Sequence, residues 1–191
     1  MSTVKSKKLQ VGTDATSSNN FTIYQPATPD GTLRIGVGNA DSPTEVGRFN
    51  SSGYVATNAP AFSAYNNTNT SFTANTLTKI IFNVEDFDTN SNYNTTNYRF
   101  TPSVAGYYQV NLSYKMETVA NRTVLSIFKN GSEYKRMIDI QSTYTRYTSG
   151  SCLVYLNGTT DYIEAYGLSA ATLSGVANSL NQFSAYLARA A

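Results

Sequence analysis

The feature that most constrains the fold is a strict two-residue alternation along residues 106–116. Apolar side chains alternate there with tyrosine, amide, hydroxyl or lysine side chains: Tyr108, Val110, Leu112, Tyr114 and Met116 against Tyr107, Gln109, Asn111, Ser113 and Lys115. Because successive side chains of a β-strand point to opposite faces of a sheet, this pattern predicts a strand with one face in a core and the other wet. No apolar set recurs at helical spacing beyond a turn or two.

Turn signals divide much of the remaining chain into short segments of strand character. Residues 123–129 and 133–140 flank Asn130-Gly131, a pair that favours a tight hairpin turn. Residues 146–157 and 161–168 flank a second turn. Further strands are expected at 21–24, 33–37, 46–50, 54–56, 79–84, 98–100 and 182–188. Many short strands separated by regular turns predict an all-β sandwich or jelly roll.

The chain is expected to divide into a segment of residues 1–58 and a head of residues 59–191. Residues 1–20 are interpreted as a flexible or docking tail. The strands that follow carry few large apolar side chains, and burying these alone cannot offset the entropy of ordering the segment. We therefore expect the first segment to be a short β-rich shaft or attachment piece that takes its core from copies of itself or from a partner.

Composition argues against several classes of function. Charged residues make up 14% of the chain against roughly 25% in ordinary domains, and its one basic cluster is residues 5–8, so we expect no nucleic-acid binding. The absence of histidine removes Ser-His-Asp and Cys-His catalysis and His-ligated zinc. The number of acidic residues leaves a pair of catalytic carboxylates of the glycosidase type open. The acidic residues that lie in turns are better explained by turn formation and loop solvation. We expect no enzyme and no cofactor.

Two further expectations follow from local sequence. Cys152 is the single cysteine and lies in an apolar strand, so it is interpreted as a small core residue. Neither an apolar leader after Met1 nor a run long enough to cross a membrane is present, so we expect no signal peptide and no membrane insertion.

Two segments are candidate binding sites. Asp86, Asp88 and Asn90 alternate oxygen ligands in a way that faintly suggests calcium, although the glycine and final glutamate of an EF-hand loop are missing. Tyr144, Arg146 and Tyr147 lie in a stretch rich in aromatic and hydroxyl groups, which suits a saccharide or protein ligand. The plainer alternatives are a polar surface loop and a strand with one wet face.

Residues 60–191 resemble the globular head of the C1q/tumour-necrosis-factor superfamily. The resemblance rests on short pieces in the family's order, at 61–64, 79–83, 98–102, 105–108, 129–131, 153–156 with 161–163, and 183–187. It departs from the family at Ala185, which replaces a glycine, and in a longer turn before Asp161. The collagen stalk is missing as well, which argues against a complement-like role.

This resemblance implies a ten-stranded jelly roll that forms homotrimers, with inner-sheet faces packed around a three-fold axis. By matching position, it implies that Tyr107, Gln109 and Phe183 approach that axis. The alternatives are an edge tyrosine, a surface amide and a core phenylalanine.

Residues 30–38 and 46–55 are similar to shaft and attachment segments of bacteriophage tail fibres. The combination favours a trimeric virion protein, assembled in the host cytoplasm, of tail-fibre or knob type. Its first segment would contact other virion proteins, and its head would bind a host-surface saccharide or protein. Two alternatives stay open at this point: a capsid decoration or head-fibre protein without a receptor role, and a bacterial C1q-like surface protein.

Overall fold

The computed structural model describes residues 8–16, 19–56, 59–116, 121–142, 147–175 and 178–191. These residues form antiparallel β-sheets, and no α-helix occurs among them, so none long and apolar enough to cross a membrane is found there. The all-β prediction is therefore confirmed. The chain divides into two compact units, Met1–Asn58 and Ala59–Ala191, which are described separately.

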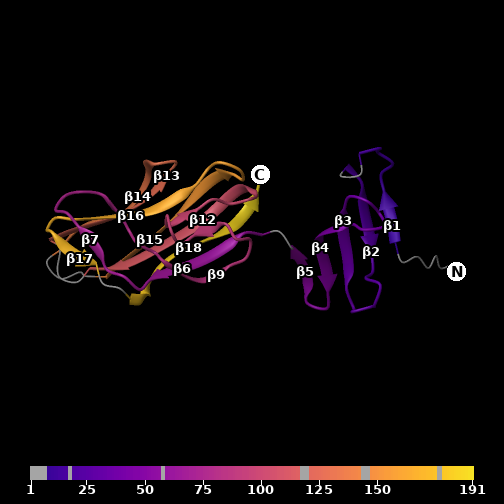
Figure 1. Ribbon diagram of the computed structural model, residues 1–191, viewed down its shortest axis with the longest axis horizontal. Helices are drawn as coiled ribbons and strands as arrows, with labels where there is room; N and C mark the ends of the chain where they lie inside the picture. Colours follow the sequence, from indigo (N-terminus) through magenta and orange to yellow (C-terminus); the bar gives the residue numbers. More distant parts are fainter. Residues whose placement is uncertain (1–7, 17–18, 57–58, 117–120, 143–146, 176–177) are drawn as a thin grey trace. The chain divides into compact units, whose positions relative to one another are not determined.

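The N-terminal unit is a single five-stranded antiparallel meander (Figure 1). Its strands follow one another in chain order: β1 Lys8–Val11, β2 Phe21–Tyr24, β3 Leu33–Val37, β4 Thr44–Asn50 and β5 Gly53–Ala56. Every strand is hydrogen-bonded to its neighbours within the same chain, with Leu9 opposite Ile23 and Ile23 opposite Ile35. The predicted bounds of β2 and β3 are confirmed.

The expectation of a flexible tail is wrong for its described part. Lys8–Val11 is a strand because Leu9 and Val11 extend the apolar rows of β2 by one more strand. The buried side chain of Asn20 then closes the connection to β2. Its Oδ1 accepts a hydrogen bond from the Asp14 backbone N–H at 3.0 Å, and its Nδ2 donates to the Asp14 carbonyl at 2.8 Å.

The C-terminal unit, the head, consists of two large sheets packed face to face and one small sheet (Figure 1). The first sheet, here called the β12 sheet, has the order β15-β12-β18-β6-β9: Tyr147–Asn157, Ala105–Lys115, Asn178–Ala190, Ala61–Asn66 and Val84–Asp88. The second, the β13 sheet, has the order β10-β11-β16-β13-β14: Tyr93–Asn94, Arg99–Phe100, Ile163–Ser169, Asn121–Lys129 and Ser132–Ser142. β8 (Thr78–Lys79) also pairs with β16, and β7 (Thr70–Phe72) pairs with β17 (Leu173–Gly175).

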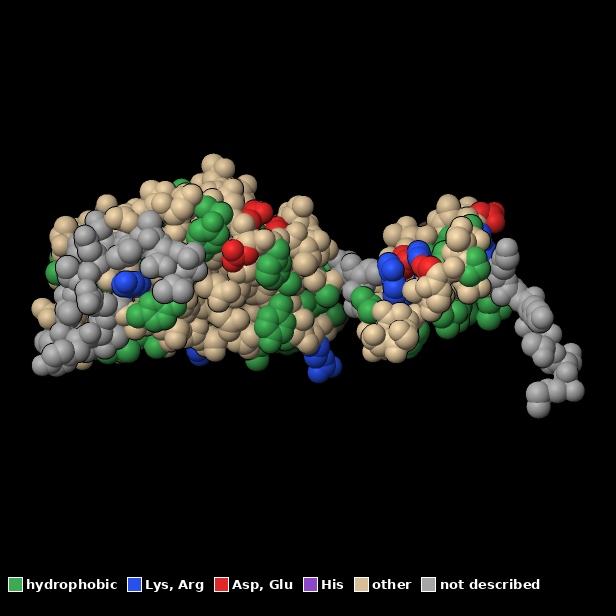
Figure 2. Space-filling view, turned by 90° about the horizontal axis from the view of Figure 1, so that it is seen from below, with side chains coloured by type: hydrophobic (Ala, Val, Ile, Leu, Met, Phe, Trp, Pro, Cys, Tyr) green, Lys and Arg blue, Asp and Glu red, His purple; other side chains and the backbone are tan. Residues whose placement is uncertain are grey.

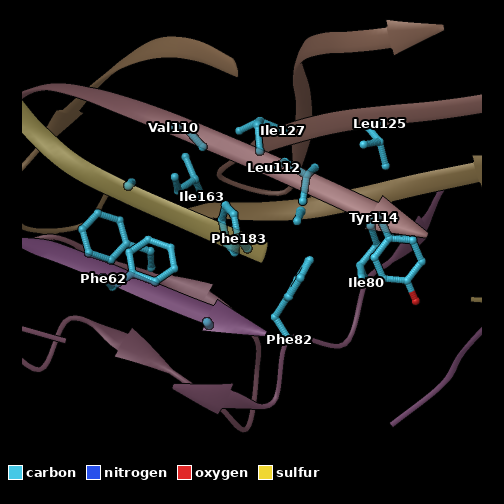
Figure 3. Close-up of a cluster of buried hydrophobic side chains, with 14 of the residues drawn as sticks. Phe62, Ile80, Phe82, Val110, Leu112, Tyr114, Leu125, Ile127, Ile163 and Phe183 are labelled. Carbon is cyan, nitrogen blue, oxygen red and sulfur yellow. The ribbon is translucent and has the colours of Figure 1, made fainter. Parts of the chain in front are cut away.

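The alternation along β12 produces the expected half-buried strand. Tyr108, Val110, Leu112 and Tyr114 are almost completely buried, whereas the residues between them are exposed or half-buried. Val110, Leu112 and Tyr114 face Leu125 and Ile127 of β13 across the sandwich (Figure 3). The Phe62 ring lies between the layers and stacks on Tyr93 and Phe100 at centroid distances of 4.6 and 4.5 Å. Hiding this much aromatic surface is the main force that holds the sandwich together.

The predicted Asn-Gly hairpin is confirmed between β13 and β14. Asn130 and Gly131 have φ angles of 52° and 81°, the pair of positive values that a tight hairpin turn requires. The Asn130 side chain also fastens the neighbouring turn. Its Nδ2 donates to Asp161 Oδ1 at 2.8 Å, and its Oδ1 accepts the Tyr162 backbone N–H at 3.0 Å.

The expected strand at 79–84 is wrong. Thr78–Lys79 pairs in the β13 sheet, and Val84–Asp88 pairs in the β12 sheet, so the chain crosses from one layer to the other between them. The side chains of Ile80 and Phe82 are fully buried along this crossing. Tyr93 Oη donates to the Phe82 carbonyl at 2.8 Å, which satisfies a backbone group that a strand partner would otherwise bond. The apolar residues of this segment indicated burial, but they did not show whether the backbone pairs in a sheet.

Candidate interaction surfaces

The outward face of the β12 sheet carries a group of large exposed side chains that we call the tyrosine patch. It comprises Tyr107 of β12, Leu153 and Tyr155 of β15, and Tyr186 of β18, with exposed fractions of 49, 56, 40 and 51%. Strand register brings them together, because Tyr107 lies opposite Tyr155, and Gln109 lies between Leu153 and Tyr186. An apolar cluster of this kind on a sheet face is typical of a protein–protein contact.

The patch rests on a rigid base because its strands are hydrogen-bonded along their length. The Tyr107 and Tyr155 rings are 5.5 Å apart and tilted by 59°, a favourable aromatic arrangement. Lys129 Nζ donates to the Tyr155 carbonyl at 2.8 Å and lies 5.7 Å from the centre of its ring. The Tyr107 and Tyr155 side chains therefore support each other in the absence of a partner.

Beyond the patch, the same sheet face becomes polar. Hydroxyl and amide groups line an open hollow of about 420 Å³ whose walls include Asn111, Ser113, Ser149, Ser151 and Gln182. Gln182 Nε2 donates to Ser63 Oγ at 3.1 Å, and the Gln182 backbone N–H donates to Ser113 Oγ at 3.1 Å. One face thus presents an aromatic half and a hydroxyl-rich half.

Two of the three residues expected at a trimer axis lie on this face, and the third does not. Tyr107 is exposed and Gln109 is half-buried, so both are available to a neighbour. Phe183 is fully buried in the core, with its ring 5.0 Å from that of Phe62 and 5.7 Å from that of Phe82. Alternation along β18 points Phe183 inward and Tyr186 outward, so a neighbour can reach Tyr186 but not Phe183.

The sequence reasoning missed Leu153, Tyr155 and Tyr186 as surface residues. The signal was present in the stretch Leu153-Val154-Tyr155-Leu156, because Val154 and Leu156 are buried and their neighbours must point the other way. Cys152, interpreted as a core residue, is half-buried and packs against the core, and burial raises the pKa of its thiol.

Of the candidate ligand-binding residues, Tyr144 and Arg146 lie outside the described residues. Tyr147 begins β15 opposite Lys115, and 46% of it is exposed. Their role in binding stays a prediction.

The segment expected as a candidate calcium loop is partly a strand, since Asp86 and Asp88 belong to β9. Asp86 Oδ2 accepts from Ser63 Oγ at 2.8 Å, and Asp88 accepts from the backbone N–H groups of Asn90 and Tyr93 at 3.2 and 2.6 Å. The first bond joins β9 to β6, and the two bonds to Asp88 shape the turn after β9. The described residues contain no group of three or more acidic, cysteine or histidine side chains that could hold a metal. Calcium binding stays a prediction.

A buried carboxylate lies on the β13 sheet. Glu164 is 2% exposed, and its Oε1 accepts from Lys79 Nζ at 2.7 Å and from Arg99 Nη2 at 2.9 Å. The Arg99 guanidinium is 3.5 Å from the centre of the Tyr162 ring. Two cations therefore compensate one carboxylate, which suits a structural ion cluster.

An exposed ladder of ion pairs joins β13 and β14. Arg122 Nη2 is 2.8 Å from Asp139 Oδ2, and Arg136 bonds both Asp139 and Glu133. The hydrogen bond from Arg122 lowers the pKa of Asp139 to about 2, with a smaller contribution from Arg136. These ion pairs link the two strands, and they make the outer face of the β13 sheet more polar than the tyrosine patch.

Solved structures share the fold of the head at low sequence identity. The globular domain of zebrafish complement 1qA is 16% identical, with a TM-score of 0.53 over 69% of this chain and 98% of that one. Murine APRIL at pH 5.0 is 10% identical, with a TM-score of 0.53 over 68% and 98%. The PRD1 vertex protein P5 is 15% identical, with a TM-score of 0.53 over 70% and 98%. No curated protein sequence matches this chain significantly.

The family model for the C1q domain matches residues 61–188, which span the head from the start of β6 to near the end of β18. Domains of this kind are typically binding modules and not enzymes. The match covers more than half of the chain, and its sheets are those of a C1q and tumour-necrosis-factor jelly roll. This chain therefore belongs to the C1q domain family.

Proposed function

We propose that this protein is a homotrimeric structural protein of a bacteriophage virion, of tail-fibre or knob type. Residues 59–191 form the outward head that binds the host surface, and residues 1–58 attach it to the particle. The protein acts by binding and has no enzymatic role.

The observation that carries the trimer is the tyrosine patch on the β12 sheet. Four large side chains, each about half exposed, share a face with rigid backbone support. At roughly 25 cal/mol per Å², hiding the exposed half of one tyrosine contributes on the order of 2 kcal/mol. Resemblance to C1q and tumour-necrosis-factor heads supports the arrangement, since those heads pack this sheet around a three-fold axis. A closed ring of three copies leaves no patch uncovered.

Two observations support a place on a virion. The PRD1 vertex protein P5 shares the head fold over almost its whole length. The N-terminal unit is a small sheet that precedes the head, as an attachment or shaft piece would.

A second candidate is a capsid decoration or head-fibre protein without a receptor role. The likeness to a vertex protein is the observation that favours it, since a vertex belongs to the capsid and not to the tail. Both candidates are trimeric virion proteins. They differ in where on the particle the protein lies and in whether its head binds the host.

Labelling with an antibody to the head, on intact particles viewed by electron microscopy, separates these candidates. Label at the tail tip, together with inhibition of adsorption by purified full-length protein, supports the receptor-binding fibre. Label on the capsid without inhibition of adsorption supports decoration. Absence from purified particles, with label on bacterial cells, would overturn the virion proposal in favour of a bacterial surface protein.

The candidate ligand residues give a finer test of the receptor role. Replacing Tyr147 by Ala should weaken the competition for adsorption if the region before β15 contacts the host. Tyr134→Ala is the matched control, because Tyr134 is equally exposed at 47% but lies on β14 near the hairpin turn. Equal competition by both variants would exclude Tyr147 from the binding surface.

A further inference from the structure

The N-terminal sheet has one apolar face that no described residue of its own unit covers. Strand register places a set of apolar side chains on this face: Leu9, Val11, Phe21, Ile23, Leu33, Ile35, Val37, Phe49 and Tyr54. Seven of them are between 37 and 59% exposed. The Tyr54 ring lies over Gly47, where a larger residue would displace it, and its centre is 5.2 Å from that of the Phe49 ring.

The opposite face carries the charges of the sheet, together with Tyr24 and Val55. All charged side chains of the described strands lie on it: Lys8, Arg34, Glu45 and Arg48. Glu45 bonds Arg48 at 2.6 Å and Arg34 at 3.1 Å, and Arg34 also bonds Asp30. Pro43 packs closely against Gly36 on this side. In Figure 2 several charged side chains of this unit form one group on the face in view, and hydrophobic side chains line its lower edge.

A sheet with one apolar face needs a second layer, because domains bury such a face against another element. The described residues of this unit form one sheet and supply no such layer. Seven half-exposed side chains represent roughly 600 Å² of apolar surface, on the order of 80 Å² each. This approaches the roughly 800 Å² per partner of a standard protein interface.

Further copies of the same sheet are the occupants that the sequence favours. The face carries no charge, so a copy of itself meets it without burying an unpaired ion. Only two residues of sequence, 57 and 58, separate the last residue of β5 from the first described residue of the head. A trimeric head would hold three such sheets at millimolar effective concentration, where weak apolar contacts suffice to join them.

We propose that the apolar faces of three N-terminal sheets pack against one another around a three-fold axis, as a three-sided prism with a hydrophobic interior. This inference rests on the trimer of the proposed function. Each copy keeps its own hydrogen-bonded five-stranded sheet, so the copies pack face to face and do not exchange strands. The central strand β3 lies nearest the axis, and its middle apolar residue is Ile35.

Site-specific disulfide formation in the full chain tests the prism. Ile35→Cys is made in a Cys152→Ser background, which removes the single native cysteine. Val55→Cys is the matched control, because it replaces another β-branched apolar residue on the opposite face. After mild oxidation, Ile35→Cys should form covalent dimers from at most about two thirds of the chains, since one cysteine per trimer is left unpaired. Val55→Cys should stay monomeric on a denaturing gel.

The outcomes separate this inference from the proposed function. A trimeric solution mass without Ile35→Cys dimers would overturn the prism and leave the head trimer standing. Equal dimer formation by the two variants would also overturn it, because the sheets would then have no fixed orientation. A monomeric solution mass would overturn both. If Ile35→Cys does not fold, Leu33→Cys serves in its place, since it lies on the same face of β3 and is 48% exposed.

Discussion

Phe183 and Tyr186 lie three residues apart on β18, and the structure assigns them opposite tasks. Phe183 is fully buried among the rings of Phe62, Phe82 and Tyr93, whereas Tyr186 is 51% exposed in the tyrosine patch. Replacing Phe183 by Ala should therefore destabilise the folded head. Replacing Tyr186 by Ala should weaken association and leave the head folded.

The expected magnitudes follow from burial. Phe→Ala in a core typically costs 3–5 kcal/mol, and the loss of three ring contacts places Phe183→Ala at about 4 kcal/mol. With a urea dependence of roughly 2 kcal/mol per M, this lowers the unfolding midpoint by about 2 M. Tyr186→Ala removes the exposed half of the tyrosine side chain that association would bury. This should weaken the free energy of association by on the order of 2 kcal/mol per copy.

The assay is urea unfolding followed by tyrosine fluorescence and far-ultraviolet circular dichroism, at one protein concentration for all variants. Solution mass is measured in parallel. The reasoning predicts a large midpoint shift for Phe183→Ala and a raised dissociation constant for Tyr186→Ala. A Phe183→Ala protein that keeps its midpoint within about 0.3 M but dissociates into monomers would refute the core assignment and restore Phe183 to the subunit interface.

Three further predictions concern single groups. Glu164→Gln should lower the free energy of unfolding, measured by urea titration, by about 2 kcal/mol, because it leaves Lys79 and Arg99 without their carboxylate. Both cations are roughly one-third exposed, so the loss is smaller than for a fully buried ion pair. The pKa of Asp139 is lowered from 3.8 to about 2 in the folded state by Arg122, so its stabilising contribution is complete above about pH 4 and is lost as pH falls toward 2. The difference in urea midpoint between wild type and Asp139→Asn should accordingly be present at pH 5 and vanish near pH 2, and a constant difference would contradict the ion pair. Gly158→Ala should cost about 2 kcal/mol or more, measured as a loss of thermal stability, because Gly158 has φ +73° and a Cβ there would meet the backbone N of Ala105.

Much of the head could be predicted from sequence because its strongest signals are local. Alternation along 106–116 specified both the strand and its buried face, and Asn130-Gly131 specified a turn that requires two positive φ angles. The family resemblance supplied the jelly-roll architecture, which no local pattern contains. The crossing at Ile80 and Phe82 was misread because buried apolar residues look alike whether or not their backbone pairs.

The surfaces were harder to predict because exposure depends on neighbours distant in sequence. Tyr107 and Gln109 were identified by family position, but their companions Leu153 and Tyr186 become adjacent only through strand register. Phe183 was misplaced because a position near the axis in a family does not say which face of the strand a side chain occupies. The apolar face of the N-terminal sheet likewise emerges only when five short strands are aligned.

The central claim is that this chain assembles as a trimer through the C1q-type head, and the solution mass of the full-length protein tests it most directly. The account predicts a single species of three times 20.8 kDa, about 62 kDa, which Tyr186→Ala shifts toward smaller species on dilution. A monodisperse species of 20.8 kDa at micromolar concentration would contradict the account, and both the fibre and the prism would fail with it.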